Sequence, residues 1–433
     1  MSRVFVIDTN KRPLDPVHPG QARLLLSSGR AAVWRMAPFT IILKEAVPEA
    51  PVKPLRVKLD PGSRKTGLAI VDDETGQIVF AAEIEHRGHR VKARLDRRRA
   101  LRRSRRSRKT RYRKPVAKRD NRTRPKGWLP PSLESRVANC LTWVERLRRL
   151  CPVSDLTMEL VRFDTHLMQE AEVSGVLYQQ GELAGYEVRE YLLAKFERTC
   201  AYCSETGVPL QIEHIVPRAR GGTNRVSNLT LACEPCNLAK GTKTAEEFGH
   251  PEVQKLARRP LRDAAAVNAT RWALYERLKA TGLSVETGSG GLTKYNRTKR
   301  GLPKSHWQDA ACTGKSTPET LRTDGVRPLR IKACGRGSRQ MCGTDKYGFP
   351  DRHRNRKRDV RGFRTGDLVR AEVPKGKRAG SHTGRVAVRA SGSFRIGGVD
   401  GINVRHCHLL QHADGYSYDQ MVRNPGGGDS SPA

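Results

Sequence analysis

Two pairs of cysteines in the chain have the spacing of metal ligands. Cys200 and Cys203 form one Cys-x-x-Cys pair, and Cys233 and Cys236 form a second pair further along. Four thiolates at such spacing are typical of a closed tetrahedral Zn²⁺ site, which stabilises a loop too small to bury a core of its own. The pairs therefore predict one structural zinc ion. Taken alone, they would also fit a zinc-bound module without any chemistry.

The residues between the two pairs argue against a module without chemistry. Glu213 and His214 end a predicted strand, and a loop that opens at two glycines leads to Asn228. Asn237 directly follows the last cysteine and begins a helical turn. A histidine beside a carboxylate on a strand, opposite an amide oxygen from a helix, can hold one Mg²⁺ ion and activate one water molecule. This segment is therefore a candidate catalytic site.

Four further residues are candidates for a second metal site. Asp60 ends a predicted strand, Glu159 lies in a later strand, and Asp309 begins a predicted helix. Three carboxylates can hold two Mg²⁺ ions, which stabilise the attacking and leaving oxygens of a phosphodiester. His306 precedes Asp309 by three residues, so on a helix both side chains project to the same side. Taken singly, Asp60 could be a turn residue and Glu159 a solvent-facing side chain, neither with a catalytic role.

The apolar pattern predicts the elements that carry these residues. Alternating apolar residues and short turns predict a three-stranded meander over residues 55–60, 68–71 and 78–84. We expect a helix from residue 132, a strand over 156–161, a helix over 261–282 and then a glycine-rich loop leading to residue 305. A small module precedes the meander, with a strand over 4–7, a proline-rich corner, a short helix over 22–26 and a strand ending at 43. Short strands with glycine turns after residue 340 suggest a small β-barrel.

The charge of the chain points to nucleic acid. The 433 residues carry a formal net charge of +38, and residues 87–126 contribute +19 of it. A compact chain with this excess repels itself unless a polyanion is near. The basic segment lies between two parts of the predicted catalytic sheet, where a disordered basic tail would be poorly placed, so a helix that grips a nucleic acid backbone is the better interpretation. Its candidate RNA-binding residues are Arg97, Arg98, Arg99, Arg102, Arg103, Arg105, Arg106, Arg108 and Lys109.

Neither a signal peptide nor a membrane-spanning stretch is evident in the sequence. Ten cysteines without an export signal argue against a disulfide framework, and metal ligation is the better expectation for those that come in pairs. We therefore expect a soluble, cytoplasmic, prokaryotic protein.

Residues 200–243 closely resemble the HNH endonuclease motif, a ββα-metal fold with a zinc knuckle. The resemblance implies that His214 is the general base, that Glu213 and Asn237 hold the catalytic metal, and that Asn228 braces the loop. The family often has aspartate where Glu213 stands, but either carboxylate can bind Mg²⁺.

The order of parts along the whole chain resembles the transposon-encoded IscB family. Pro13-Leu14-Asp15-Pro16 looks like the PLMP motif of that family, with Asp15 in place of methionine, and Arg102 to Arg106 match its arginine motif. The resemblance implies a RuvC site formed by Asp60, Glu159, His306 and Asp309. The expected fold class is α/β multidomain: a split RNase H-like RuvC domain with an inserted HNH module, an arginine-rich bridge helix and a small C-terminal β-barrel-like domain.

The expected domains follow from this order. They are a PLMP-like module (1–52), RuvC part I (53–86), the bridge helix (87–126), RuvC part II (127–180), the HNH module with its zinc knuckle (181–255), RuvC part III (256–325) and a C-terminal β-rich domain that contacts RNA and a target-adjacent motif (326–433).

The resemblance implies an RNA-guided DNA endonuclease. The HNH site would cut the guide-paired strand and the RuvC site the displaced strand, with Mg²⁺ or Mn²⁺ at both sites and a structural Zn²⁺. The expected partners are a noncoding guide RNA and double-stranded DNA, bound by a monomer. Two alternatives remain open: a conventional HNH homing or restriction-like endonuclease, and a non-catalytic nucleic-acid-binding transposon accessory protein.

Overall fold

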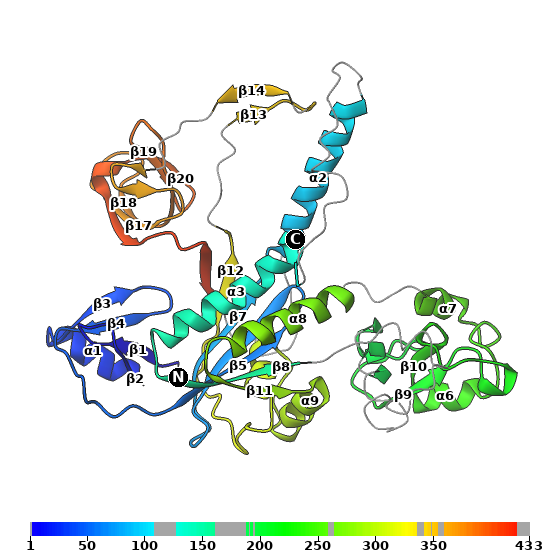
Figure 1. Cartoon of the computed structure of the whole chain (residues 1–433). Helices are drawn as coiled ribbons and strands as arrows, with labels where there is room; N and C mark the ends of the chain where they lie inside the picture. The colour runs from blue at the N-terminus through cyan, green and yellow to red at the C-terminus, as the bar shows by residue number, and fades with distance from the viewer. Residues whose placement is uncertain are drawn as a thin grey trace.

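The computed structural model describes residues 2–107, 127–160, 188–189, 191–193, 195–258, 264–335, 342–347, 349–353 and 359–421. Its centre is a seven-stranded mixed sheet with the strand order β11-β8-β5-β6-β7-β12-β22 (Figure 1). These strands are β5 (Leu55–Pro61), β6 (Lys65–Val71), β7 (Ile78–Glu85), β8 (Val153–Glu159), β11 (Ser284–Gly288), β12 (Leu329–Ala333) and β22 (Tyr416–Gln420). The mixture of helices and sheets confirms the predicted α/β class.

The predicted meander is confirmed. β5, β6 and β7 pair antiparallel in succession, and β8 pairs parallel to β5 with Leu59 opposite Met158. Because both strands run in the same direction, their carboxyl ends meet at one edge of the sheet. Asp60 and Glu159 are the next residues along each strand, so this register places them side by side.

The two faces of the sheet are covered by different helices. Leu59, Leu68 and their neighbours form the larger core with α3 (Pro131–Arg148) and α8 (Ala264–Lys279). Ala69 and Val71, which point the other way, pack under α10 (His306–Ala311). At Gly67 of β6 an added Cβ would lie 1.7 Å from the backbone oxygen of His306. Only glycine therefore allows α10 to lie this close to the sheet, beside the end of β5.

Some elements differ from the sequence predictions. The expected glycine-rich loop before residue 305 contains β11 and the helix α9 (Gly290–Lys299). Glycines at 288, 290 and 291 interrupt the apolar pattern, so the sequence does not indicate either element. β12 and β22 pair with each other, and β12 also pairs with β7. The central sheet therefore includes two strands from the expected C-terminal domain.

The N-terminal module is a four-stranded sheet with the order β2-β1-β4-β3, packed against α1 (Pro19–Ser27). The predicted strands are confirmed as β1 (Val4–Ile7) and β4 (Thr40–Leu43). The proline-rich corner is instead a strand, β2 (Pro13–Val17), which tolerates proline because it lies at the edge. β3 (Ala31–Arg35) is mostly exposed and so has no alternating apolar signature.

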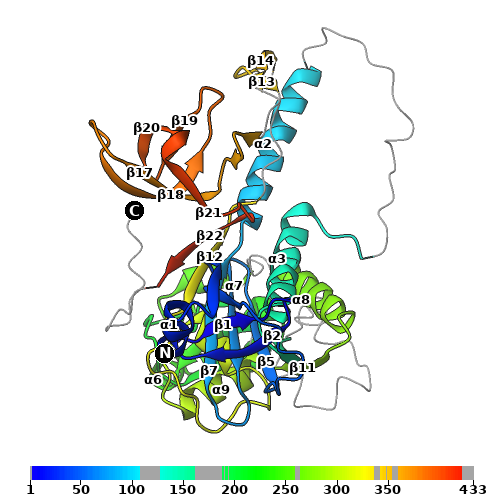
Figure 2. The same cartoon turned by 90° about the vertical axis from the view of Figure 1, so that its left-hand side faces the viewer.

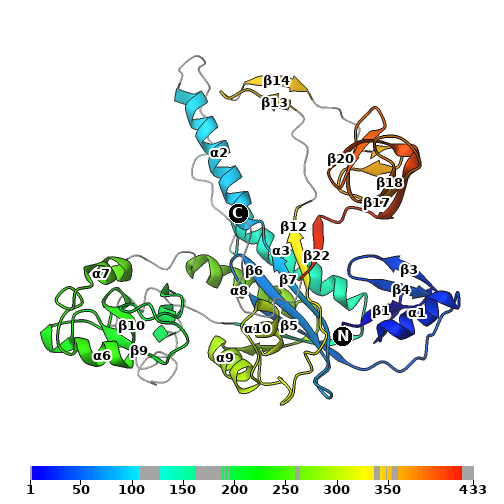
Figure 3. The ribbon, with the colours of Figure 1, turned by 180° about the vertical axis from the view of Figure 1, so that it is seen from behind.

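Residues 195–258 form a separate unit beside the central sheet, on the side opposite the N-terminal module (Figure 3). An antiparallel hairpin of β9 (Leu210–His214) and β10 (Leu229–Cys233) is followed by α6 (Glu234–Lys240) and α7 (Pro251–Arg258). The short helices η2 (Arg218–Arg220) and η3 (Val226–Asn228) lie in the loop between the two strands. The unit has its own apolar core, which includes Leu210, Leu229 and Leu231, and Tyr191 and Leu192, which precede the unit in the chain, pack into the same core.

The arginine-rich segment forms α2 (Gly88–Ser107), which rises away from the central sheet (Figure 2). After β12 the chain forms two short hairpins and a five-stranded antiparallel sheet with the order β20-β19-β18-β17-β21. The hairpins are β13 (Cys342–Thr344) with β14 (Pro350–His353), and β15 (Asp359–Val360) with β16 (Phe363–Arg364). The sheet contains β17 (Leu368–Val373), β18 (Gly380–Ala387), β19 (Ser393–Ile396), β20 (Val399–Asn403) and β21 (Cys407–Gln411), with η4 (Val404–His406) before the last. None of the described helices is both long and apolar enough to cross a membrane.

Candidate active sites

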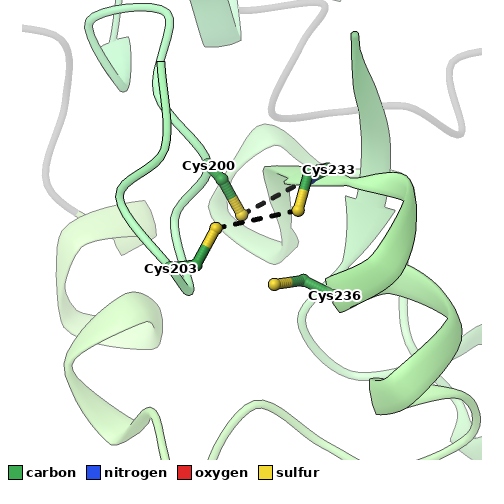
Figure 4. Close-up of side chains that lie close together, drawn as sticks. All are labelled: Cys200, Cys203, Cys233 and Cys236. Atoms are coloured by element: carbon green, nitrogen blue, oxygen red, sulfur yellow. Dashed lines mark hydrogen bonds between the residues drawn. The ribbon is translucent and has the colours of Figure 1, made fainter. Parts of the chain in front are cut away.

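The four paired cysteines come together in space (Figure 4). Cys200 and Cys203 lie in the loop before β9, Cys233 ends β10, and Cys236 lies in α6. Their sulfur atoms all lie within 4.8 Å of one another, and Cys203 Sγ is 3.7 Å from Cys233 Sγ. That separation is too long for a disulfide, but two thiolates on one tetrahedral zinc ion lie about 3.8 Å apart. The cluster can therefore hold a zinc ion.

The electrostatics of the cluster also favour a cation. Burial opposes ionisation of Cys200, but backbone N–H groups at Cys203 and Cys233 outweigh it and lower the pKa of this thiol to about 7. Burial, together with the neighbouring sulfur atoms, raises the pKa of Cys236 well above its usual value. Four thiolates this close repel one another, so all of them ionise together only around a metal ion.

β9 places Glu213 and His214 in succession, so their side chains leave opposite faces of the strand. Glu213 is buried, and both of its carboxylate oxygens are occupied. Tyr202 Oη donates to Oε2 over 2.7 Å, and Lys240 Nζ donates to Oε1 over 2.6 Å. Burial, together with the Glu213 carboxylate, raises the pKa of Tyr202 far above its usual range. The phenol therefore remains a hydrogen-bond donor.

The side chains of His214 and Asn237 lie on different faces of the hairpin. His214 Nε2 lies 2.9 Å from Asn224 Oδ1, in the loop after β9. Asn237 Nδ2, on α6, donates to Gln211 Oε1 over 2.7 Å. Gln211 shares a face of β9 with Glu213, so Asn237 lies on the Glu213 side.

Asn228 is held in the loop between the strands. Its Oδ1 accepts from Val216 N over 3.0 Å, and its Nδ2 donates to Val216 O over 3.0 Å and to Thr223 O over 2.9 Å. These contacts give it the geometry of a loop brace.

The second group of candidates meets at the carboxyl ends of β5 and β8. His306 Nδ1, on α10, lies 3.8 Å from Asp60 Oδ2. The interaction with Asp60 raises the pKa of His306 against the effect of burial. Burial raises the pKa of Asp309, and the Asp60 carboxylate raises it further. Glu159 is 9% exposed, which excludes the solvent-facing interpretation.

Two arginines that the sequence analysis did not single out contact these carboxylates. Arg271 Nη2, on α8, donates to Glu159 Oε1 over 2.9 Å, and Arg297 Nε, on α9, lies 2.7 Å from Asp309 Oδ1. Lys240 and Tyr202 in the cysteine-rich unit were also missed. Tyr202 lies between Cys200 and Cys203 in the sequence, and Lys240 follows Asn237 by one helical turn. These positions next to candidate ligands are the sequence signal that could have indicated the two residues. Among the described residues, the four cysteines form the only group of three or more histidine, cysteine or acidic side chains whose ligand atoms all lie within 4.8 Å of one another.

The candidate RNA-binding arginines on α2, Arg97 to Arg99, Arg102, Arg103, Arg105 and Arg106, are all exposed. Arg108 and Lys109 lie outside the described residues. The helix begins against α3, because an added Cβ at Gly88 would lie 2.8 Å from Arg136 Nε. One end of α2 is therefore fixed, and its arginine side chains are open to solvent.

Two protein families match the chain. The RRXRR protein family matches residues 4–181, which contain the meander and α2, and the HNH endonuclease family matches residues 200–243. Together, the two matches fit the arrangement expected of an IscB-like nuclease. The HNH match, over residues 200–243, supports a nuclease domain in the cysteine-rich unit, and HNH nucleases depend on metal ions.

Solved structures of Cas9 are similar to parts of this chain. Cas9 from Streptococcus thermophilus, in complex with an AGGA PAM, is 11% identical with a TM-score of 0.22, over 60% of this chain and 32% of Cas9. The Type II-C Cas9 from Actinomyces naeslundii is 19% identical with a TM-score of 0.16, over 44% of this chain and 32% of that enzyme. The matched part is therefore about a third of the length of those proteins. No curated protein matches the chain.

Proposed function

We propose that this chain is an RNA-guided DNA endonuclease with two metal-dependent sites. The observation that carries the proposal is the presence of two separate groups of candidate catalytic residues on different structural units. One group lies at the carboxyl ends of β5 and β8 with α10, and the other lies on the β9–β10 hairpin with α6. Two sites on separate units can act on two strands.

The first site is proposed to be the RuvC site, formed by Asp60, Glu159, His306 and Asp309. An antiparallel meander continued by two parallel strands, β8 and β11, supports the expected RNase H-like fold. Mg²⁺ or Mn²⁺ would stabilise the attacking and leaving oxygens of the phosphodiester. The chain supplies the carboxylates for it, with His306 beside Asp60 to handle a proton.

The second site is proposed to be the HNH site, with Glu213 and Asn237, on one face of β9, as metal ligands and His214, which leaves the opposite face, as general base. Asn224 Oδ1 can only accept a hydrogen bond, so His214 carries its proton on Nε2. This tautomer leaves Nδ1 with a lone pair that can take a proton from water. Asn228 holds the loop that carries Asn224.

RNA guiding is supported by the arginines of α2. A few side chains on a groove-fitting element suffice to read bases, whereas a dense row of exposed arginines suits phosphate contacts, which carry no sequence information. A guide strand would then supply the specificity, and the HNH site would cut the strand paired to it. We propose that the C-terminal sheet contacts RNA or a short motif beside the target, and that the domain limits are those expected from the sequence.

A strand-resolved cleavage assay tests the two-site proposal. His214→Ala removes the proposed base at one site, and Asp60→Ala removes a proposed metal ligand at the other. With the RNA that copurifies, each variant should nick one strand, on opposite strands, and the double variant should bind without cutting. Double-strand breaks by His214→Ala at the normal rate would exclude the HNH assignment. Site-specific cutting by RNA-free protein would favour the homing-type alternative.

A further inference from the structure

Three of the carboxylates proposed to hold metal ions are each paired with a basic side chain of the same unit. The pairs are Glu213 with Lys240 at 2.6 Å, Glu159 with Arg271 at 2.9 Å and Asp309 with Arg297 at 2.7 Å. Both proposed sites therefore contain positive charge before any metal ion enters.

These pairs are enclosed. The Lys240 side chain is 0% exposed and that of Glu213 is 7% exposed. For Arg271 with Glu159 and Arg297 with Asp309 the exposed fractions are 20% or less, whereas the surface pair Arg30 with Glu45 is 64% and 58% exposed. A buried charge without a partner is costly, so each carboxylate needs a cation in the metal-free protein.

Each basic side chain is also anchored to a backbone carbonyl near its site. Lys240 Nζ donates to His214 O over 2.9 Å, and Arg271 Nε donates to Pro61 O over 3.1 Å. Arg297 Nη1 donates to Leu302 O over 3.2 Å. His214 follows Glu213 and Pro61 follows Asp60. Each cation is therefore held by two contacts, one with a carboxylate and one with a backbone carbonyl, and its position beside the carboxylate is fixed.

We propose that Lys240, Arg271 and Arg297 are resident counter-cations with which a divalent ion competes for the catalytic carboxylates, so that they set the metal affinity of each site. The inference rests on the proposed function. A divalent ion must bind a carboxylate oxygen directly, and a cation already on the same carboxylate repels it. The phosphates of a bound nucleic acid strand add negative charge at the site, which favours the metal ion over the resident cation. Metal loading is thereby tied to the presence of substrate.

The test is the Mn²⁺ affinity of the full chain without nucleic acid, measured by electron paramagnetic resonance. Arg297→Met and Lys240→Met each remove one resident cation. Each should tighten one class of Mn²⁺ site by about tenfold, because the competing charge is gone. Lys299→Met on α9 and Lys243→Met after α6 are the matched controls, since both lysines are exposed. The controls should leave the affinity unchanged within about twofold.

The outcomes separate this inference from the proposed function. Equal or weaker Mn²⁺ binding by Arg297→Met, with normal binding by the wild type, would overturn the inference alone. Absence of Mn²⁺ binding by the wild type would overturn the proposed function and the inference together. If Lys240→Met does not fold, the double variant Lys240→Met with Glu213→Gln removes both buried charges. It should fold and lose the HNH class of Mn²⁺ site while the RuvC class remains, and retention of both classes would count against the competition at Glu213.

Discussion

Asn228 and Asn237 are chemically identical residues with different environments. Asn228 is 9% exposed and makes three hydrogen bonds with the backbone of Val216 and Thr223. Asn237 is half-buried, and its side chain makes a solvent-exposed hydrogen bond with Gln211. The first environment is that of a structural brace, and the second is that of a residue available to a ligand.

This difference predicts that substitution by alanine affects mainly stability at Asn228 and mainly activity at Asn237. Asn228→Ala should lower the free energy of unfolding of the HNH unit by about 2–3 kcal/mol, because buried backbone groups lose their partners. Asn237→Ala should lower it by less than about 0.5 kcal/mol, yet abolish nicking at the HNH site. Chemical denaturation and strand-resolved nicking measure the two effects. Equal losses of stability would contradict the assigned roles.

The candidate residues themselves could be predicted from type and spacing, whereas their charged partners could not. Asp60, Glu159 and Asp309 are acidic residues at strand or helix ends, which a sequence reading can locate. Arg271 and Arg297 lie in a chain with 82 lysines and arginines, so nothing local distinguishes them. Only the packing of α8 and α9 beside the strand ends shows which arginines meet the carboxylates.

At the scale of elements, the cysteine cluster connects the two halves of the HNH unit. It joins the loop before β9 to the start of α6, and Tyr202 in that loop contacts Glu213 over 2.7 Å. The geometry of the proposed site therefore depends on the metal cluster.

Removal of zinc should unfold this unit and leave the central sheet intact. Purified protein should contain about one zinc ion per chain, and Cys233→Ser should lose it. Hydrogen exchange should then show lost protection in β9, β10 and α6 but not in β5 to β8. Cys334→Ser, an exposed cysteine outside the cluster, is the control and should keep the metal. Active wild-type protein without zinc would refute this account.

His86, after the end of β7, packs beside the start of α2. Its Nε2 lies 2.7 Å from Thr66 Oγ1, and its Nδ1 lies 3.3 Å from Asn139 Nδ2. Burial, with Arg136 nearby, lowers the pKa of His86 to about 3. The folded protein therefore keeps this ring neutral, whereas the unfolded chain protonates it near pH 6.5.

Below pH 6.5 the unfolded state binds a proton that the folded state excludes, so stability should fall as pH decreases toward 3. The slope from this residue is at most about 1.4 kcal/mol per pH unit. His86→Gln should show a shallower loss of unfolding free energy between pH 6 and about pH 4. His408→Gln, at an exposed position, should keep the wild-type slope. An unchanged slope in His86→Gln would show that the ring is not held neutral.

Elements with a regular pattern could be predicted, and elements formed by distant pairing could not. Runs of apolar residues separated by short turns identify β5 to β7, because each of these strands pairs with the next one along the chain. β22 pairs with β12 although Tyr416 and Ala333 lie far apart in the chain. Such pairing depends on the whole fold, so the local sequence of β22 does not indicate its sheet.

At the scale of the whole molecule, one carboxylate joins three parts of the chain. Asp414, just before β22, accepts hydrogen bonds from Arg35 of the N-terminal module, from Arg146 of α3 and from Tyr418. Met36 N and Ala37 N also donate to Gln411 Oε1, each over 3.1 Å. The N-terminal module is therefore fixed to the central sheet and to the C-terminal sheet together.

The net charge of +38 is a property of the whole molecule, and it favours binding to a polyanion. We propose that this partner is a guide RNA gripped by α2. Replacing Arg102, Arg103, Arg105 and Arg106 with alanine should weaken RNA binding and lower both strand cuts together, while the zinc cluster stays folded. Loss of one cut alone would show that the arginines serve a single nuclease site.

Guide-directed cleavage is the most direct test of the central claim. The RNA that copurifies with the chain is sequenced, its pairing segment is rewritten, and the cut positions on both DNA strands are mapped. The account predicts that both cuts move to the sequence that matches the rewritten segment, and that protein without RNA binds DNA in a salt-sensitive, sequence-indifferent way. Cuts that stay at the original sequence, or that persist after the RNA is digested, would contradict it.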